Sequence, residues 1–247
     1  MQIMIQRRIR MAKSKERSEI ENIERLINDK GVQFRDFREY KIETRKTDEG
    51  QDSLIVTGKP VVFDSRTFLF HDSWDGYDVY EEIDPHAFDE ADMDDVIFNY
   101  NHCGRVFARS RKGKGNLQLD VEEEYMSMEA ELWADDEGHR QLHRDIDRGI
   151  IDKMSFAFSV EEVNWIENEE KHEAVRRITK VKRLFDVSAV DIPAYDATEI
   201  SARSAAIPER RKLQSERRAA ASRSGNEAAK LEMLERKLLR AKLGGNR

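Results

Sequence analysis

The chain has 247 residues, of which 38% are hydrophobic and 38% charged, and it contains one cysteine, Cys103. That length suits a single core with appendages, and a lone cysteine excludes an internal disulfide and fits a reducing compartment. Charge is uneven: residues 1–33 carry a net +3 and residues 204–247 a net +7, so the body between them carries −17. An acidic body argues against nucleic acid as its substrate. No apolar run is long enough for a membrane span, so we expect a soluble intracellular protein.

The N-terminal residues 1–33 are predicted to form a charged helical arm. Ser18 and Glu21 have the spacing of a capping box, and Ile20, Ile23 and Ile27 follow at helical spacing. The apolar face is narrow, which indicates a peripheral element rather than part of the core.

The body, residues 34–203, is predicted to consist of many short strands with few helices. One helix is expected over residues 135–148 and a short one from Asp84, while residues 65–76 are expected to form a loop. The predicted strands cover residues 41–44, 53–58, 60–63, 77–83, 95–102, 105–109, 117–121, 126–132, 154–160, 163–166, 176–183 and 185–190. The pattern favours an α+β, mainly β fold with a β-barrel-like core and surrounding helices.

Residues 204–247 differ in character from the body. They are basic, and Leu231, Leu234 and Leu238 form a short apolar stripe at helical spacing. We expect a mobile, largely helical tail.

Residues 149–159 contain the most distinctive pattern in the chain. From Met154 onward bulky and small residues alternate, so Met154, Phe156 and Phe158 would share one face of a strand and Ser155 would lie on the other. A serine held rigidly on the small-residue face of a buried strand can serve as a nucleophile. The plainer interpretation is that Ser155 only leaves room for a neighbouring side chain.

His102 and Asp186 are the other candidates for acid–base chemistry. His102 follows a predicted strand, and an imidazole with an ordinary pKa of about 6.5 suits proton transfer near neutral pH. Adjacent Cys103 is poorly placed to form a dyad with it, because neighbours on an extended chain face opposite ways. Asp186 lies among apolar residues, where a carboxylate needs a partner, and a histidine ring N–H would supply one. Asp186 could instead face water on an edge strand.

The predicted helix also carries residues that could ligate a metal ion. His139 and His143 are four residues apart and would share a face with Asp135 or Asp136 one turn earlier. The glutamate of the metalloprotease motif is missing and the chain has a single cysteine, so a solvated helix face is the preferred interpretation. No metal and no cofactor is expected.

The chain resembles the prohead (capsid-maturation) serine proteases of tailed bacteriophages in five motifs, which occur here in the same order and with the same spacing as in that family. They are residues 61–63, 83–88, 101–102, 149–158 and 184–188, and the resemblance extends from about residue 56 to residue 203. That family is similar in fold to the herpesvirus assembly proteases, which are built on a β-barrel with surrounding helices. By position, the resemblance implies that Ser155 is the nucleophile, His102 the base and Asp186 the third member. Asp186 stands where the family usually has a glutamate, which is one methylene longer.

The resemblance implies a serine endopeptidase that acts inside the immature prohead in the host cytoplasm. It would cleave the scaffolding protein or scaffold-like segments of the major capsid protein, and also itself. Its partners would be those proteins, with self-association as a further option and no membrane. The tail, residues 204–247, would carry the enzyme into the shell and then be removed. The alternative is a non-enzymatic assembly or scaffolding protein with a protease-like body, but retention of Ser155, His102 and Asp186 together favours the enzyme.

Overall fold

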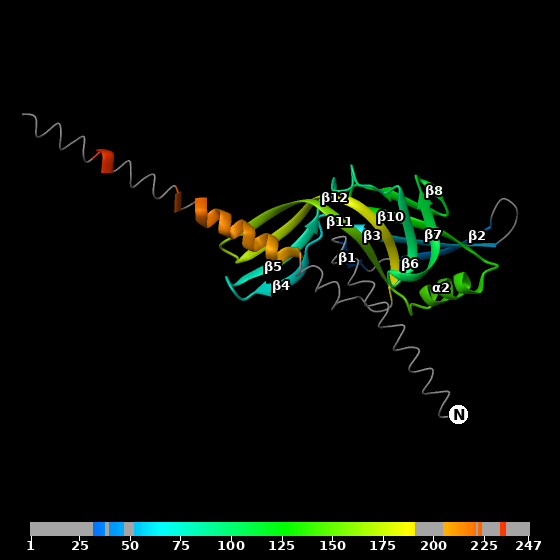
Figure 1. Cartoon of the computed structure of the whole chain (residues 1–247). Helices are drawn as coiled ribbons and strands as arrows, with labels where there is room; N and C mark the ends of the chain where they lie inside the picture. Colours follow the sequence, from blue (N-terminus) through cyan, green and yellow to red (C-terminus); the bar gives the residue numbers. More distant parts are fainter. Residues whose placement is uncertain are drawn as a thin grey trace, which may run out of the picture. The chain divides into compact units, whose positions relative to one another are not determined.

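The computed structural model describes residues 32–37, 40–46, 52–190, 205–220, 222–223 and 233–235 (Figure 1). The chain divides into two compact units, residues 1–203 and 204–247, and the second is helical wherever it is described. The N-terminal helix predicted before Gly31 lies outside the described residues. In the part of the chain that is described, no helix is long and apolar enough to cross a membrane.

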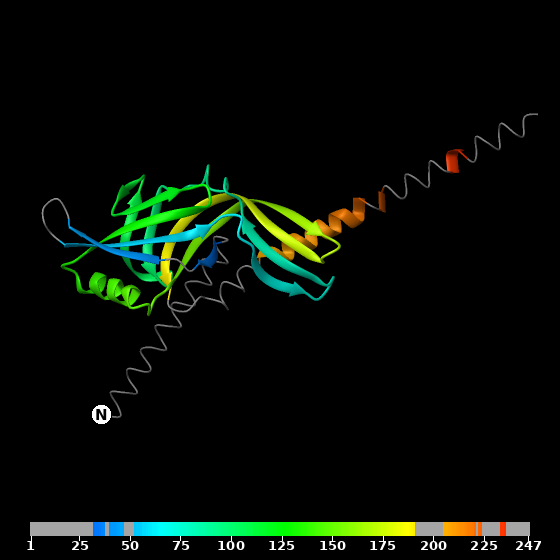
Figure 2. The same cartoon turned by 180° about the vertical axis from the view of Figure 1, so that it is seen from behind.

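The larger of two sheets has eight strands. Strands β1, β11, β12, β6, β7 and β8 follow one another in that order, while β5 pairs with β12 and β4 pairs with β5 (Figures 1 and 2). Their bounds are β1 Val32–Phe37, β4 Thr67–Asp72, β5 Tyr77–Ile83, β6 Asp95–Tyr100, β7 Cys103–Arg111, β8 Lys114–Gly115, β11 Lys153–Asn168 and β12 Glu173–Val190. Strand β12 is the central element, because residues 173–178 pair in parallel with β5 and residues 186–189 pair in parallel with β6.

The smaller sheet is antiparallel, with the order β2, β3, β10, β9. Its bounds are β2 Tyr40–Lys46, β3 Asp52–Val62, β9 Leu117–Val121 and β10 Tyr125–Trp133. Burial alternates along β10, so that Met126, Met128, Ala130 and Leu132 point inward, as expected for a strand with one face toward the core and the other toward solvent. These side chains join inward residues of the larger sheet in one hydrophobic core.

Strand β11 changes its surroundings halfway along. Residues 154–159 are buried on both faces, whereas residues from Glu161 onward alternate between exposed and half-buried. In the buried part the rings of Phe156 and Phe158 lie 4.7 Å apart on the core side. The opposite face, with Ser155, is buried as well, so small and polar groups there must find partners within the protein.

Helix α2, Glu137–Asp147, is the predicted internal helix. Asp136 is its N-cap and accepts a hydrogen bond from the backbone N–H of His139 at 3.1 Å, while Leu142 and Ile146 are buried. Gly149 follows with φ 67°, which suits glycine after a helix end. The prediction for this segment is confirmed.

The prediction of a mainly β fold is confirmed, but the sheets are not closed into a barrel. Barrel-like therefore describes the fold only loosely. The larger sheet ends in β1 on one side and the two-residue strand β8 on the other, and these do not pair. Closure would require those edges to meet.

Several local predictions were wrong. Each of three pairs of predicted strands forms one strand, because β-bulges let the ladders continue through the irregular positions: 53–58 with 60–63 in β3, 154–160 with 163–166 in β11, and 176–183 with 185–190 in β12. Residues 65–76 contain strand β4, which pairs with β5 across a similar irregularity. The segment from Asp84 is a turn, not a helix: its carboxylate accepts from the N–H of His86, and the chain then bonds back to β12 through Ala87 and Val181.

Candidate active site

Ser155 lies near the start of β11, directly opposite Ser188 of β12. Two residues further along, Ala157 lies opposite Asp186. Side chains of directly opposed residues share a face of the sheet, so Ser155, Asp186 and Ser188 are all on one side. Ser155 has no exposed surface.

His102 reaches the same face from the turn between β6 and β7. Asn101 and His102 both adopt left-handed backbone conformations, with φ of 52° and 56°, and the N–H of Asn101 donates to the carbonyl of Ala189 in β12 at 2.9 Å. Left-handed backbone at a non-glycine residue costs about 1–2 kcal/mol, and such costs concentrate at functional sites. The turn is therefore tied to β12 beside Asp186.

The two ring nitrogens of His102 contact the other two residues singled out from the sequence. Nδ1 lies 2.7 Å from Asp186 Oδ1, and Nε2 lies 2.6 Å from Ser155 Oγ. An ionised carboxylate only accepts, so the ring proton belongs on Nδ1, where it is donated to Asp186. Nε2 then accepts a hydrogen bond from the Ser155 hydroxyl. The three residues, distant in sequence, form one continuous chain of hydrogen bonds.

Two further residues complete the cluster and were not identified as site residues from the sequence. Ser188 Oγ lies 2.8 Å from Asp186 Oδ1 and 3.1 Å from His102 Nδ1, and it also contacts the side-chain amide of Asn99. Its single proton can be donated to Asp186. Ser188 has no exposed surface and Asn99 is 3% exposed. The available signal was spacing: Ser188 follows Asp186 by two positions on a strand, so both share a face.

This arrangement can transfer a proton. A hydroxyl hydrogen-bonded to a neutral imidazole can lose its proton to that ring as the oxygen attacks a carbonyl, and a buried carboxylate stabilises the resulting imidazolium. Cys103 has a different contact, with its sulfur 3.8 Å from the carbonyl oxygen of Tyr100. Its thiol forms no part of the hydrogen-bond chain.

The structure does not support a metal site on α2. No group of three or more His, Cys, Asp or Glu residues that could hold a metal occurs among the described residues. His139 is 1% exposed, its ring stacks on Trp133, and its Nδ1 accepts from the N–H of Trp133 at 2.9 Å. The prediction of a solvated face was therefore wrong for His139. Burial, followed by the charge of Arg105, lowers the pKa of His139, which suits a neutral acceptor.

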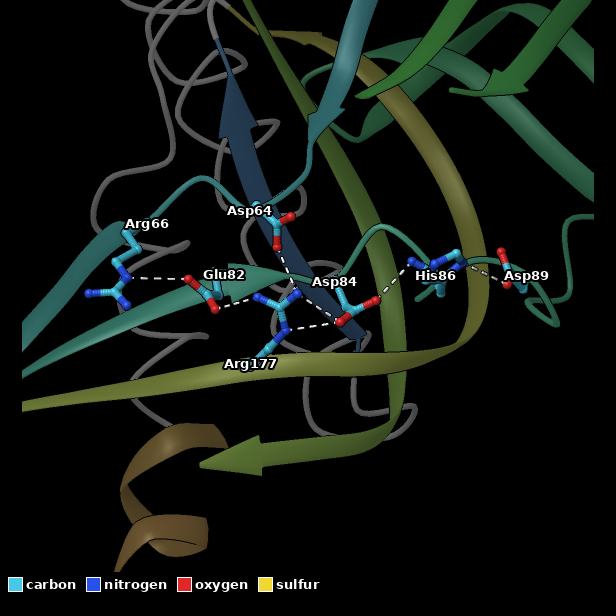
Figure 3. Close-up of polar contacts among 7 residues, drawn as sticks. All are labelled: Asp64, Arg66, Glu82, Asp84, His86, Asp89 and Arg177. Carbon is cyan, nitrogen blue, oxygen red and sulfur yellow. Dashed lines mark hydrogen bonds and ion pairs between the residues drawn. The ribbon is translucent and has the colours of Figure 1, made fainter. Parts of the chain in front are cut away.

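A second polar cluster lies on the other half of β12. Arg177 donates to Glu82 and Asp84 and pairs with Asp64, while Arg66 pairs with Glu82 (Figure 3). Burial acts to lower the pKa of Arg177, but the hydrogen bonds that the guanidinium donates to these carboxylates outweigh it and raise the pKa. The guanidinium is thus permanently charged, and the cluster fastens β12 to β5 and to the turns that flank it.

The neighbouring pair on β12 and β5 is buried more deeply. Arg176 lies opposite Glu81 in the parallel ladder, with Nη1 2.7 Å from Oε2, and the two side chains are 0% and 3% exposed. Successive residues on a strand face opposite sides of the sheet, so Arg176 and Arg177 secure both faces of the pairing between β5 and β12.

Comparison with known proteins gives a family. The family model described as caudovirus prohead serine protease matches residues 40–212, which is more than half of the chain. No curated protein matches. Among solved structures, the bacteriophage T4 capsid assembly protease gp21 is similar with a TM-score of 0.37 and 11% identity, over 66% of this chain and 99% of that chain. Since the family model spans nearly all of the described strands, the chain belongs to the caudovirus prohead serine proteases.

Proposed function

We propose that the chain is a serine endopeptidase in which Ser155 is the nucleophile, His102 the general base and Asp186 the residue that orients His102. The observation that carries the proposal is that His102 bridges the other two, with Nε2 2.6 Å from Ser155 Oγ and Nδ1 2.7 Å from Asp186 Oδ1. Membership of a serine protease family supports the same assignment.

The reaction follows from this geometry. As Ser155 Oγ attacks the scissile carbonyl, its proton passes to Nε2 of His102, and the imidazolium is stabilised by Asp186. The proton then goes to the leaving amine nitrogen, so that the C–N bond breaks and an acyl ester forms on Ser155. Water activated by the same histidine hydrolyses the ester and regenerates the hydroxyl.

The shorter side chain of Asp186 does not prevent the orienting role. Family members usually have a glutamate here, yet Asp186 Oδ1 lies within hydrogen-bond distance of His102 Nδ1. The left-handed turn at Asn101 and His102, held to Ala189, brings the ring close to β12. Ser188 acts as a positioning residue, because its hydroxyl is 2.8 Å from the same carboxylate oxygen. The side-chain amide of Asn99 in turn contacts the Ser188 hydroxyl.

The substrates proposed are the scaffolding protein, or scaffold-like segments of the major capsid protein, and the enzyme itself. Prohead protease family membership supports partners that belong to the capsid. We place the enzyme inside the immature prohead, where a high local concentration of substrate would make tight intrinsic binding unnecessary. A non-enzymatic assembly protein would have no need for the hydrogen-bond chain from Ser155 to Asp186.

The test is co-expression with the major capsid protein and scaffold of the same phage, read by intact mass. Wild type should shorten those proteins, and Ser155→Ala should leave them and the enzyme at full length. The variant should fold normally, because only one hydroxyl is lost. Ser110→Ala is the matched control, since Ser110 is another buried strand serine, 5% exposed, outside the site. Processing by Ser155→Ala at the wild-type rate would overturn the assignment.

A further inference from the structure

Strand β11 has two edges beside Ser155, and they have different neighbours. One edge pairs with β12, which carries Asp186 and cannot leave without dismantling the hydrogen-bond chain. The other edge pairs with β1, Val32–Phe37, in antiparallel register from Val32 opposite Ser159 to Phe37 opposite Met154. Asp36 is the β1 residue directly opposite Ser155.

In this arrangement the site is closed to a protein substrate. Ser155 has no exposed surface, and the side chains of His102 and Asp186 are 4% and 9% exposed. A scissile carbonyl must come within about 3–3.5 Å of the nucleophile before it can react. Part of the chain beside Ser155 must therefore move before a peptide can be cut.

The edge now occupied by β1 has the geometry that an extended substrate needs. Paired strands lie about 4.8 Å apart, so a peptide in that position would have its backbone within about 5 Å of Ser155, and a small shift brings one of its carbonyls into reach. Addition of a strand to a sheet edge is a common way to bind extended peptides, with main-chain hydrogen bonds providing affinity. The edge of β11 over residues 154–159 matches a segment of about six residues.

Strand β1 is also the neighbour that can leave most easily. Among the described strands it is terminal in the larger sheet, whereas β12 is paired with β11 on one side and with β5 and β6 on the other. Removing a terminal strand breaks one ladder, and removing an interior strand breaks at least two.

We propose that residues 32–37 are an intramolecular occupant of the substrate-binding edge, and that an extended segment of the substrate replaces them in antiparallel register on β11. This rests on the proposed function and adds where the substrate lies and how access to Ser155 is controlled. The enzyme is closed while β1 is paired and becomes competent when β1 is displaced. A protease that assembles together with its substrates would benefit from such a closed state.

The experiment locks β1 in place with a reversible disulfide. Val32→Cys with Ser159→Cys joins a directly opposed pair, whose Cα separation in antiparallel sheets, about 4.5–5.5 Å, suits a disulfide. Cys103→Ser removes the native thiol in every protein used. The oxidised enzyme should cleave the capsid and scaffold substrates at least tenfold more slowly than wild type, and dithiothreitol should restore the rate.

The matched control is Lys41→Cys with Thr57→Cys, which joins β2 to β3 and leaves β11 untouched. Its oxidised and reduced forms should cleave equally. Equal cleavage by both forms of the β1 lock would overturn the displacement of β1 and leave the assignment of Ser155 intact. Absence of cleavage by the reduced lock and by wild type alike would overturn the proposed function, and this inference with it.

A second measurement tests the same inference without the disulfide variant, in case the Val32→Cys, Ser159→Cys protein does not fold. Amide hydrogen exchange is measured on Ser155→Ala, otherwise unaltered, with and without uncut substrate. Protection of residues 32–37 should fall on binding, while that of residues 40–46 in β2 stays the same. Unchanged protection of residues 32–37 in the bound enzyme would overturn the inference.

Discussion

The two halves of β12 each hold a polar cluster, and the clusters differ in kind. In the half next to β6, Asp186 faces the imidazole of His102 and the hydroxyl of Ser188. In the half next to β5, residues 173–178, Glu81 faces the guanidinium group of Arg176. Glu82 and Asp84 face that of Arg177 (Figure 3). Both clusters contain carboxylates, but they differ in exposure: Asp186 and the Arg176–Glu81 pair are buried, whereas the side chains of Arg177 and Asp64 are 23% and 56% exposed.

The difference shows how the partner of a carboxylate decides what the cluster can do. A guanidinium keeps its proton at every accessible pH, so the pairs beside β5 can only hold strands in register. An imidazole gains and loses a proton near neutral pH, so the cluster beside β6 can take part in a reaction. One strand thus combines a fixed clamp with a site able to transfer protons, and substitutions should separate the two.

The largest effect is expected for Asp186→Asn, which should lower the rate of cleavage by about 10³–10⁴-fold. The amide can donate to His102 Nδ1, which favours the ring tautomer that cannot accept the Ser155 proton. The shape is unchanged, so the protein should remain folded, and Asp186→Glu should retain substantial activity. Rates on purified substrate and circular dichroism measure both. A folded Asp186→Asn enzyme with the wild-type rate would make this carboxylate purely structural, like those beside β5.

Glu81→Gln should act on stability instead of on the reaction. It leaves the buried guanidinium of Arg176 without its charge partner, and breaking such a pair costs about 3–5 kcal/mol of unfolding free energy. Urea unfolding provides the measurement, and the rate per folded molecule should stay at the wild-type value. The control is Glu81→Leu with Arg176→Met, which removes both charges and should cost much less. Wild-type stability of Glu81→Gln would contradict the view of this pair as a clamp.

Ser188→Ala should lower kcat by about tenfold, which corresponds to about 1.4 kcal/mol, because one hydrogen bond that holds Asp186 is lost. KM should be unchanged, since Ser188 acts on the positioning of Asp186 and not on substrate binding. Ser110→Ala, which removes a buried strand hydroxyl elsewhere, controls for loss of packing. Equal reductions in the two variants would assign Ser188 a packing role only.

The smallest effect concerns Asp84 and depends on pH. Burial raises the pKa of this carboxyl, but hydrogen bonds from the His86 N–H and from Arg177 outweigh it and lower the pKa. A lowered folded-state pKa stabilises the protein above the ordinary carboxyl range and is lost as the pH falls through the folded value. Asp84→Asn should therefore cost about 1 kcal/mol at pH 7, in the range of a partly exposed ion pair, and less at about pH 3, below the ordinary carboxyl pKa. Parallel unfolding curves at both pH values would show no such linkage.

The three central residues of the candidate site were singled out before the structure was known, but the two residues that hydrogen-bond around them were not. Alternation of bulky and small residues made Ser155 a candidate, and the need of a carboxylate among apolar residues for a partner did the same for Asp186. The resemblance to the prohead proteases selected these two together with His102. Asn99 and Ser188 were missed because short polar residues are common in strands of every kind. Their role depends on which strand lies next to theirs. The parallel pairing of β6 with β12 places Asn99 opposite Ser188.

The sequence by itself determined the mainly β character, helix α2 and the small-residue face around Ser155, because each follows from local spacing and propensity. Only the tertiary structure decided that β11 and β12 continue through bulges, that the sheets stay open, and that β1 covers the edge beside Ser155. Strand pairing is a contact between distant segments, and many registers satisfy the same alternation. The register that forms is the one in which all paired strands together bury their apolar side chains most favourably. The local alternation of residues does not specify which distant strands pair.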